Sequence, residues 1–246
     1  MVLKEDFASA IRAGDVRYVS DILATGIDVN VESGSALALA ARYGHVELVS
    51  LLVDRGAKVD MQHEHHKDTA LIEATKKKHT EVVSLLLDRG AGVDVKNRYG
   101  GTALTSASGK GHIPIVTLLL DRGAELDVKN TSGNTALIMA AAGGHIKVVT
   151  LLLDRGAELG VSDTGGNTAL IIATHQGHTQ IVTLLLDRGA KVDAKNTSGD
   201  TALIRAARGG HTQVLSLLLD RGAEVHGRSS YGDTVLIEAT NSVRPR

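Results

Sequence analysis

The fold of this chain is decided by one stretch, Gly144-His145-Ile146-Lys147-Val148-Val149-Thr150-Leu151-Leu152-Leu153-Asp154-Arg155-Gly156-Ala157, which occurs six times with few changes. Its histidine recurs at intervals of 34, 33, 33, 33 and 33 residues. The six copies are marked by His45, His79, His112, His145, His178 and His211. A fixed period of this length is typical of an array of small stacked units, because each unit is too small to bury a core of its own.

Each copy of this stretch predicts an amphipathic α-helix. Apolar side chains occupy most positions from Ile146 to Leu153, at a spacing that places them on one broad stripe. Arg155 follows in the last turn, where a cation meets the negative end of the helix dipole. Gly156 can adopt the left-handed conformation that ends a helix. Because such a helix cannot bury its stripe alone, we expect it to pack against the next copy of itself.

A second, shorter helix is expected ahead of each copy. Residues 129–134 are rich in Asn, Thr, Ser and Gly and predict a turn. Thr135 is a good N-cap residue, and the alanine-rich residues 136–142 then predict a short helix that ends at Gly143-Gly144. The histidine after these glycines is interpreted as a turn residue whose ring bonds nearby backbone at the start of the second helix, not as a catalytic group.

The combined motif resembles the ankyrin repeat. Thr135-Ala136-Leu137-Ile138-Met139-Ala140 is similar to the family signature Thr-Pro-Leu-His-x-Ala, with Ala in place of Pro and Ile in place of the first His. Related phrases begin at Thr69, Thr102, Thr168 and Thr201. The resemblance implies an all-α fold, namely an ankyrin-repeat solenoid of stacked helix-turn-helix units with β-hairpin or loop connections.

A single ankyrin-repeat domain is therefore expected over residues 1–246. Its predicted divisions are an N-terminal cap repeat at 1–33, six repeats at 34–66, 67–99, 100–132, 133–165, 166–198 and 199–231, and a partial C-terminal repeat at 232–246. Asp21 stands where later copies carry Leu, as expected of a terminal unit with one face in water. The seventh unit is half complete, which predicts either a natural cap or a segment of a longer protein.

Composition narrows the possible functions. The formal net charge is −1, so no overall field favours nucleic acid or a membrane surface. The chain has no cysteine, which excludes thiolate metal sites and thiol catalysis and fits a cytoplasmic location. No apolar run is long enough for membrane insertion. No phosphate loop, dinucleotide motif or zinc-protease motif occurs, so we predict neither an enzyme nor a cofactor.

Two local clusters leave alternatives open. His63, His65 and His66 are weak candidates for a metal site, but alternating positions in a turn do not define a tetrahedron, so a solvated loop is favoured. Lys76-Lys77-Lys78 forms a basic patch after a first helix. It is interpreted as a solvated helix end, with contact to an acidic partner, nuclear import or nucleic-acid binding as alternatives.

The binding surface is predicted from the columns that differ between copies, because columns that pack between units must stay the same. The variable columns are the turn tips and the ends of the first helices, with a milder one inside the first helix. In the ankyrin family these parts line one concave face, and that face binds proteins. The candidate partner-binding residues are Arg42, Tyr43, Glu73, Lys76, Lys77, Arg98, Tyr99, Lys110, His175, Gln176, Arg205, Arg208 and Tyr231.

The functional hypothesis is a non-catalytic scaffold that binds a partner protein or an extended peptide on this face. Tyrosine and arginine are frequent binding hot spots. Because most of the candidates are cationic, the partner is expected to be acidic or mixed, and the chain itself is expected to be a monomer. The alternative is a structural spacer or a self-associating repeat segment of a larger protein.

Overall fold

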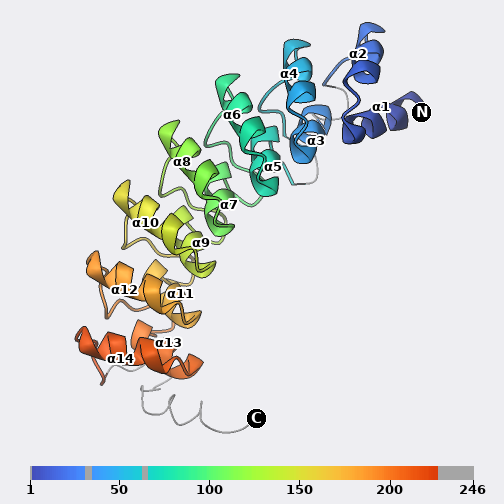
Figure 1. Ribbon diagram of the computed structural model, residues 1–246. Helices are drawn as coiled ribbons and strands as arrows, with labels where there is room; N and C mark the ends of the chain where they lie inside the picture. Colours follow the sequence, from blue (N-terminus) through green and yellow to red (C-terminus); the bar gives the residue numbers. More distant parts are fainter. Residues whose placement is uncertain (1, 31–34, 63–65, 227–246) are drawn as a thin grey trace. The chain divides into compact units, whose positions relative to one another are not determined.

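The computed structural model describes residues 2–30, 35–62 and 66–226 (Figure 1). Within these residues the chain forms fourteen α-helices and an isolated antiparallel bridge between Ser162 and Thr168. The helices are α1 (Val2–Ala13), α2 (Val16–Ala24), α3 (Ser35–Tyr43), α4 (Val46–Asp54), α5 (Ala70–Lys77), α6 (Thr80–Asp88), α7 (Ala103–Gly109), α8 (Ile113–Asp121), α9 (Ala136–Ala142), α10 (Ile146–Asp154), α11 (Ala169–His175), α12 (Thr179–Asp187), α13 (Ala202–Gly209) and α14 (Thr212–Asp220). The predicted all-α repeat architecture is confirmed.

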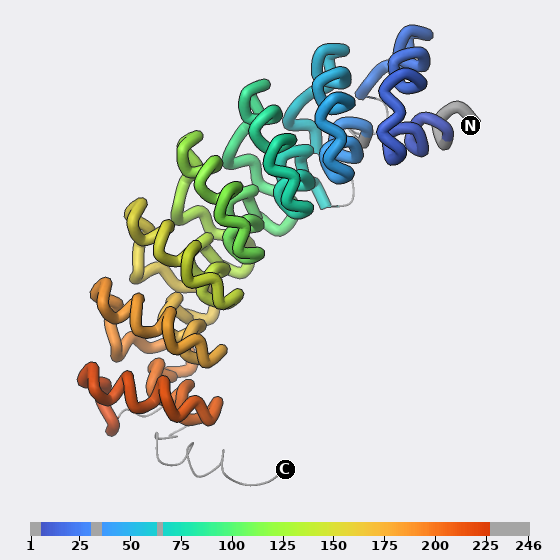
Figure 2. The backbone as a smooth tube through the Cα atoms, in the orientation of Figure 1, coloured from blue at the N-terminus to red at the C-terminus, as the bar shows by residue number. Residues whose placement is uncertain are grey.

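The chain divides into two compact units. The first comprises Met1–Ala107 and His112–Glu125, and the second comprises Ser108–Gly111 and Leu126–Arg246. In the first unit, α1, α3 and α5 pack as a row of first helices, and α2, α4, α6 and α8 pack as a row of second helices. In the second unit the same two rows are α9, α11, α13 and α10, α12, α14. The tube in Figure 2 shows this alternation of short helices within each unit.

The second helices bury the apolar stripe that the sequence predicts. In α10 the side chains of Val148, Val149 and Leu152 are buried, whereas those of Ile146 and Leu151 are half-buried. The equivalent positions of α4, α6, α8 and α12 are buried in the same way. These side chains fill the space between neighbouring repeats, so each repeat depends on the next one for its core.

The predicted helix ends are also confirmed. The side-chain oxygen of Thr135 accepts a hydrogen bond from the Ile138 N–H at 3.4 Å, which caps α9. Thr69, Thr168 and Thr201 cap α5, α11 and α13 in the same manner. Gly156 has a φ of 94°, the left-handed conformation expected after α10.

The repeated histidines contact a different partner from the one that the sequence suggests. Each stands at the N-cap of its second helix, but its side chain makes no capping bond there. In five of the repeats the ring N–H instead donates to a carbonyl of the preceding repeat, because successive repeats stack with the ring over the end of the neighbouring first helix. The pairs, 2.9–3.3 Å long, are His45 with Arg12, His79 with Arg42, His145 with Gly109, His178 with Ala142 and His211 with His175.

In four repeats the arginine that follows the second helix bonds to the aspartate of the preceding repeat, whereas Arg55 donates to Ser20 Oγ at 3.1 Å. The four pairs are Arg89 with Asp54 at 2.7 Å, Arg122 with Asp88 at 2.9 Å, Arg188 with Asp154 at 2.8 Å and Arg221 with Asp187 at 2.7 Å. These side chains are substantially exposed, so each pair contributes less than about 1 kcal/mol.

A second polar column ties the connection after most of the second helices to the next repeat. Its side-chain oxygens accept a hydrogen bond from a main-chain N–H about one repeat later. The pairs are Asn30 with Lys58, Asp60 with Gly92, Asp94 with Glu125, Asp127 with Glu158 and Asp193 with Glu224, at 2.9 to 3.3 Å. Burial raises the pKa of Asp94 and of Asp127, against the opposing effect of the main-chain hydrogen bond, and the charge of Glu125 or Glu158 adds to the rise.

We expect Asp127→Asn to stabilise the fold at pH 7 and to have no such effect in acid. A raised pKa means that the folded chain holds the proton more tightly than the unfolded chain, so ionisation above the folded pKa costs stability. An amide keeps the acceptor oxygen without the charge, as Asn30 does in the first repeat. The gain is below about 1 kcal/mol because the site is partly exposed, and it fades as the pH falls below about 4, the pKa of an unfolded aspartate. Urea denaturation at both pH values measures it, and an equal gain at both would contradict this account.

Candidate interaction surface

The turns between repeats are joined to one another by main-chain hydrogen bonds. In the first unit the N–H of Arg98 donates to the carbonyl of His66 at 2.9 Å. In the second unit the N–H groups of Thr164 and Thr197 donate to the carbonyls of Ser132 and Gly165 at 3.0 and 2.9 Å, and the threonine hydroxyls donate to the same carbonyls. The turn tips within each unit therefore form a ladder that fixes the side chains they carry.

Tyr99 stands on this ladder with its ring largely in solvent. Its side chain is 53% exposed, its ring centroid lies 6.0 Å from that of His66, and its hydroxyl lies 3.5 Å from His66 Nδ1. The N–H of Tyr99 donates to Asn97 Oδ1 at 3.0 Å. The tyrosine is thus held in place while much of its surface stays open to a partner.

A buried carboxylate lies beside this turn. Asp68 is 1% exposed, and its two oxygens contact Lys76 Nζ at 2.6 Å and Asn97 Nδ2 at 2.8 Å. A carboxylate in this position needs a cation, because burial of an unpaired charge is costly. Lys76, predicted as a partner-binding residue, therefore neutralises Asp68 in the folded chain.

The same surface continues along α5 to the end of α3. Glu73 and Lys76 lie one turn apart on α5 and so share a face. Arg42 Nη1 lies 4.0 Å from Glu73 Oε2, and the ring of Tyr43 stacks on that of His45 with centroids 6.2 Å apart. Tyr43 is 47% exposed. In the first unit, contacts therefore link the end of α3 through α5 to the turn that carries Tyr99.

The second unit contains a related cluster around another buried carboxylate. Asp200 is 1% exposed, and its Oδ2 lies 3.0 Å from Arg205 Nε and 2.9 Å from Arg208 Nη1. The adjacent turns are joined by a bond of 2.9 Å from Asn196 Nδ2 to Asn167 Oδ1. Arg205 and Arg208, both predicted as partner-binding residues, thus face an internal acid.

His175 lies close to these arginines at the end of α11. Burial lowers its pKa, and the charges of Arg205, His211 and Arg208 lower it further. The imidazole is therefore neutral at pH 7 and adds no positive charge to the surface. It is exposed and offers a partner a ring that can donate or accept a hydrogen bond.

The remaining candidates divide into two groups. Lys77, Arg98, Lys110 and Gln176 are exposed in the structure. Tyr231 and two of the three weak metal candidates, His63 and His65, lie outside the described residues, while His66 contacts Tyr99.

A pairing between two columns, which the sequence analysis missed, explains part of this surface. The residue before each capping threonine is Asp only in the described repeats that carry a cation eight positions later, as in Asp68 with Lys76 and Asp200 with Arg208. Asn134 and Asn167 stand opposite Ala142 and His175. The sequence signal for these pairs is an Asp eight positions before a Lys or Arg, although Arg42 follows Gly34 and Asp233 precedes Asn241 in the same two columns.

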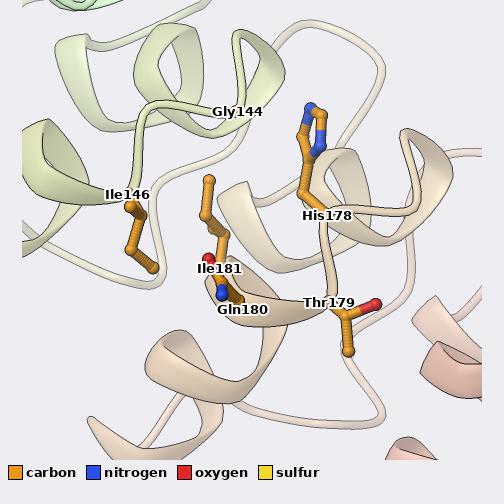
Figure 3. A pocket seen from close by; sticks show the side chains of 6 residues that line it. All are labelled: Gly144, Ile146, His178, Thr179, Gln180 and Ile181. Carbon is orange, nitrogen blue, oxygen red and sulfur yellow. The ribbon is translucent and has the colours of Figure 1, made fainter.

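Small clefts lie where a second helix begins beside the preceding repeat. Figure 3 shows one in the second unit, with the side chains of His178 and Ile181 beside the turn at Gly144. Its volume is about 160 Å³. A cleft at the corresponding place in the first unit, beside Gly44 and His79, measures about 290 Å³. Both are at or below the smallest sites that usually hold small molecules, which start near 300 Å³.

Within residues 2–30, 35–62 and 66–226, no three His, Asp or Glu side chains are grouped as metal ligands. Across the same part of the chain, no helix has the length and apolar character needed to cross a bilayer.

Comparisons with known proteins agree with the repeat architecture. The family model described as ankyrin repeats in three copies matches residues 37–130 and 123–196, and a second model of ankyrin repeats in many copies matches residues 176–219. The solved ankyrin repeat domain of Bcl-3, a member of the IkappaB protein family, is 31% identical, with a TM-score of 0.73 over 82% of this chain and 92% of that chain. No curated protein matches.

Ankyrin repeats generally mediate protein–protein interactions and are typically non-catalytic. The predicted resemblance is confirmed, and this chain belongs to the ankyrin repeat family.

Proposed function

We propose that this chain is a non-catalytic binding module whose partner protein or peptide docks on the turn tips and first helices. Tyr43, Lys77 and Tyr99 of the first unit are its proposed anchors. The observation that carries the proposal is that Tyr43 and Tyr99 are each about half exposed, yet each ring lies against a histidine ring. A large side chain that is already held in place loses little conformational entropy when a partner covers it.

The buried Asp68 and Asp200 change the charge that the partner is expected to carry. Lys76, Arg205 and Arg208 face Asp68 or Asp200, and Arg42 lies near Glu73, so part of the positive charge seen in the sequence is already compensated. We therefore propose a partner surface of mixed character, with acidic side chains opposite Lys77 and Arg98 and an apolar contact for the tyrosines.

Affinity capture tests the proposal. The full chain is immobilised, partners from a cell lysate are identified by mass spectrometry, and the affinity of the chief partner is measured by calorimetry. The triple variant Tyr43→Ala, Lys77→Ala, Tyr99→Ala is expected to lose at least about tenfold in affinity, because truncated aromatic anchors dominate binding energy.

The matched control is Arg17→Ala with Tyr18→Ala, which removes an exposed cation and an exposed tyrosine from α2 in the row of second helices. This control is expected to bind like the unaltered chain. Equal loss in both variants, or no loss in the triple variant, would reject the proposed face. Concentration-dependent growth of the particle in light scattering, with no captured partner, would favour the self-associating segment instead.

A further inference from the structure

One repeat of the second unit lacks the polar side chain that ties its neighbours together. Gly160 occupies the column whose other members accept a hydrogen bond from the next repeat, namely Asn30, Asp60, Asp94, Asp127 and Asp193. The donor that corresponds to this position is the main-chain N–H of Lys191, which has no acceptor among the described residues. A Cβ placed on Gly160 would meet none of the chain's described atoms within 4 Å, so the space of the absent side chain is open.

A second small residue enlarges this space. Ala194 stands where the equivalent positions carry Val95, Val128 and Val161. The result is a cavity of about 220 Å³ lined by Leu159, Gly160, Thr168, Gly189, Ala190, Lys191 and Ala194. Two residues that line the cavity are more exposed than the residues at the equivalent positions of other repeats. Thr168 is half-buried, whereas Thr135 and Thr201 are buried. Ala190 is half-buried, whereas Ala157 and Ala223 are buried.

The charge at this place is opposite to that of three equivalent places and the same as that of a fourth, where the neutral Asn30 stands with Lys58. Asp94 with Glu125, Asp127 with Glu158 and Asp193 with Glu224 each bring two acids together, whereas Gly160 with Lys191 leaves one cation and no acid. An exposed ammonium group beside an unpaired main-chain N–H is a favourable setting for an anion, since both are donors and neither has an acceptor to compete with it.

We propose that this cavity binds a carboxylate side chain, an Asp or Glu presented by a partner protein, in the place that the chain's own carboxylate fills in other repeats. The carboxylate accepts from the Lys191 N–H and lies near the Lys191 ammonium group, while the methyl groups of Thr168, Ala190 and Ala194 surround its carbon atoms. The site is in the second unit and independent of the proposed Tyr43 and Tyr99 surface. Either proposal can fail without the other.

Amide chemical shifts of the full, isotopically labelled chain test the site. The probes are a blocked Ala-Asp-Ala tripeptide, its Ala-Asn-Ala counterpart, sodium acetate and sodium chloride at equal ionic strength. We expect the Asp peptide to shift the Lys191 amide saturably, with a dissociation constant on the order of 10 mM, as suits a ligand of few atoms. The Asn peptide and chloride are expected to bind at least tenfold more weakly.

The matched variant is Gly160→Asp, which supplies the carboxylate from within the chain. It is expected to abolish the shift of the Lys191 amide by the Asp peptide and to raise the urea midpoint of the chain. An unsaturable shift, a shift that persists in Gly160→Asp, or equal binding of the Asp and Asn peptides would overturn the proposal. Saturable binding of acetate without binding of the Asp peptide would overturn it as well, because the cavity would then take only free carboxylates.

Discussion

Lys76→Met is expected to lower the free energy of unfolding by about 3 kcal/mol, the lower end of the cost of breaking a buried ion pair. Its ammonium group lies 2.6 Å from Asp68 Oδ2, and Asp68 is almost completely buried. Methionine keeps much of the length of the side chain, so the variant removes the charge and leaves the packing largely intact. Urea denaturation of the full chain, followed by circular dichroism, measures the loss.

The second variant separates charge from packing. Adding Asp68→Asn to Lys76→Met is expected to restore most of the stability, because the chain itself carries Asn134 opposite Ala142, where no cation is present. The neighbouring Lys77→Met serves as the control and is expected to change stability by less than about 0.5 kcal/mol, since Lys77 is exposed. If Lys76→Met and Lys77→Met cost the same, or if Asp68→Asn restores nothing, the pairing has no energetic role.

Gly177→Ala is expected to destabilise the fold by about 2 to 3 kcal/mol, the second largest effect that we predict. Gly177 has a φ of 73°, where a Cβ costs about 1 to 2 kcal/mol, and that Cβ would lie 2.7 Å from His211 Nδ1. The clash would push the His211 ring away from the carbonyl of His175, to which it donates at 2.9 Å, so a hydrogen bond worth about 1 kcal/mol is lost as well.

The chain offers a matched control for this prediction. Gly210 has a φ of 69°, but a Cβ there would meet none of the described atoms within 4 Å. Gly210→Ala therefore reports the cost of the left-handed conformation alone, expected at about 1 kcal/mol. Lys78, with a φ of 67° in the same column, shows that a non-glycine residue is tolerated there. In a His211→Ala background, Gly177→Ala should cost no more than Gly210→Ala, and a larger remaining cost would disprove the clash.

Local features of the fold could be predicted because their causes lie close together in sequence. Thr135 caps α9 through a residue three positions away, and Gly156 ends α10 because of its own conformational freedom. The apolar stripe of α10 recurs in every copy, so the packing of each repeat against the next could be predicted as well. The histidine column shows the limit of this reasoning: its place at the helix start was predicted, but its acceptor lies more than thirty residues away.

The candidate surface could be predicted in outline only. Lys76 and Lys77 are adjacent and chemically identical, yet Lys76 bonds a buried carboxylate and Lys77 is exposed. Both lysines are predicted from the sequence as binding residues. The sequence does not separate them, because the direction of each side chain depends on the rotation of α5 against the preceding turn. For the same reason, Arg205 and Arg208 are predicted from the sequence to be open to a partner, although both contact Asp200 in the structure.

The sequence by itself determined the family, the alternation of alanine-rich first helices with leucine-rich second helices and the turn residues that end them, because these depend on a period and on local conformational preference. Tertiary structure alone decided which polar groups meet across repeats. It brought the ring of His178 to the carbonyl of Ala142 and the N–H of Lys191 to the position of Gly160, since hydrogen bonds form only over a few ångströms and partners in different repeats meet only once the repeats have stacked.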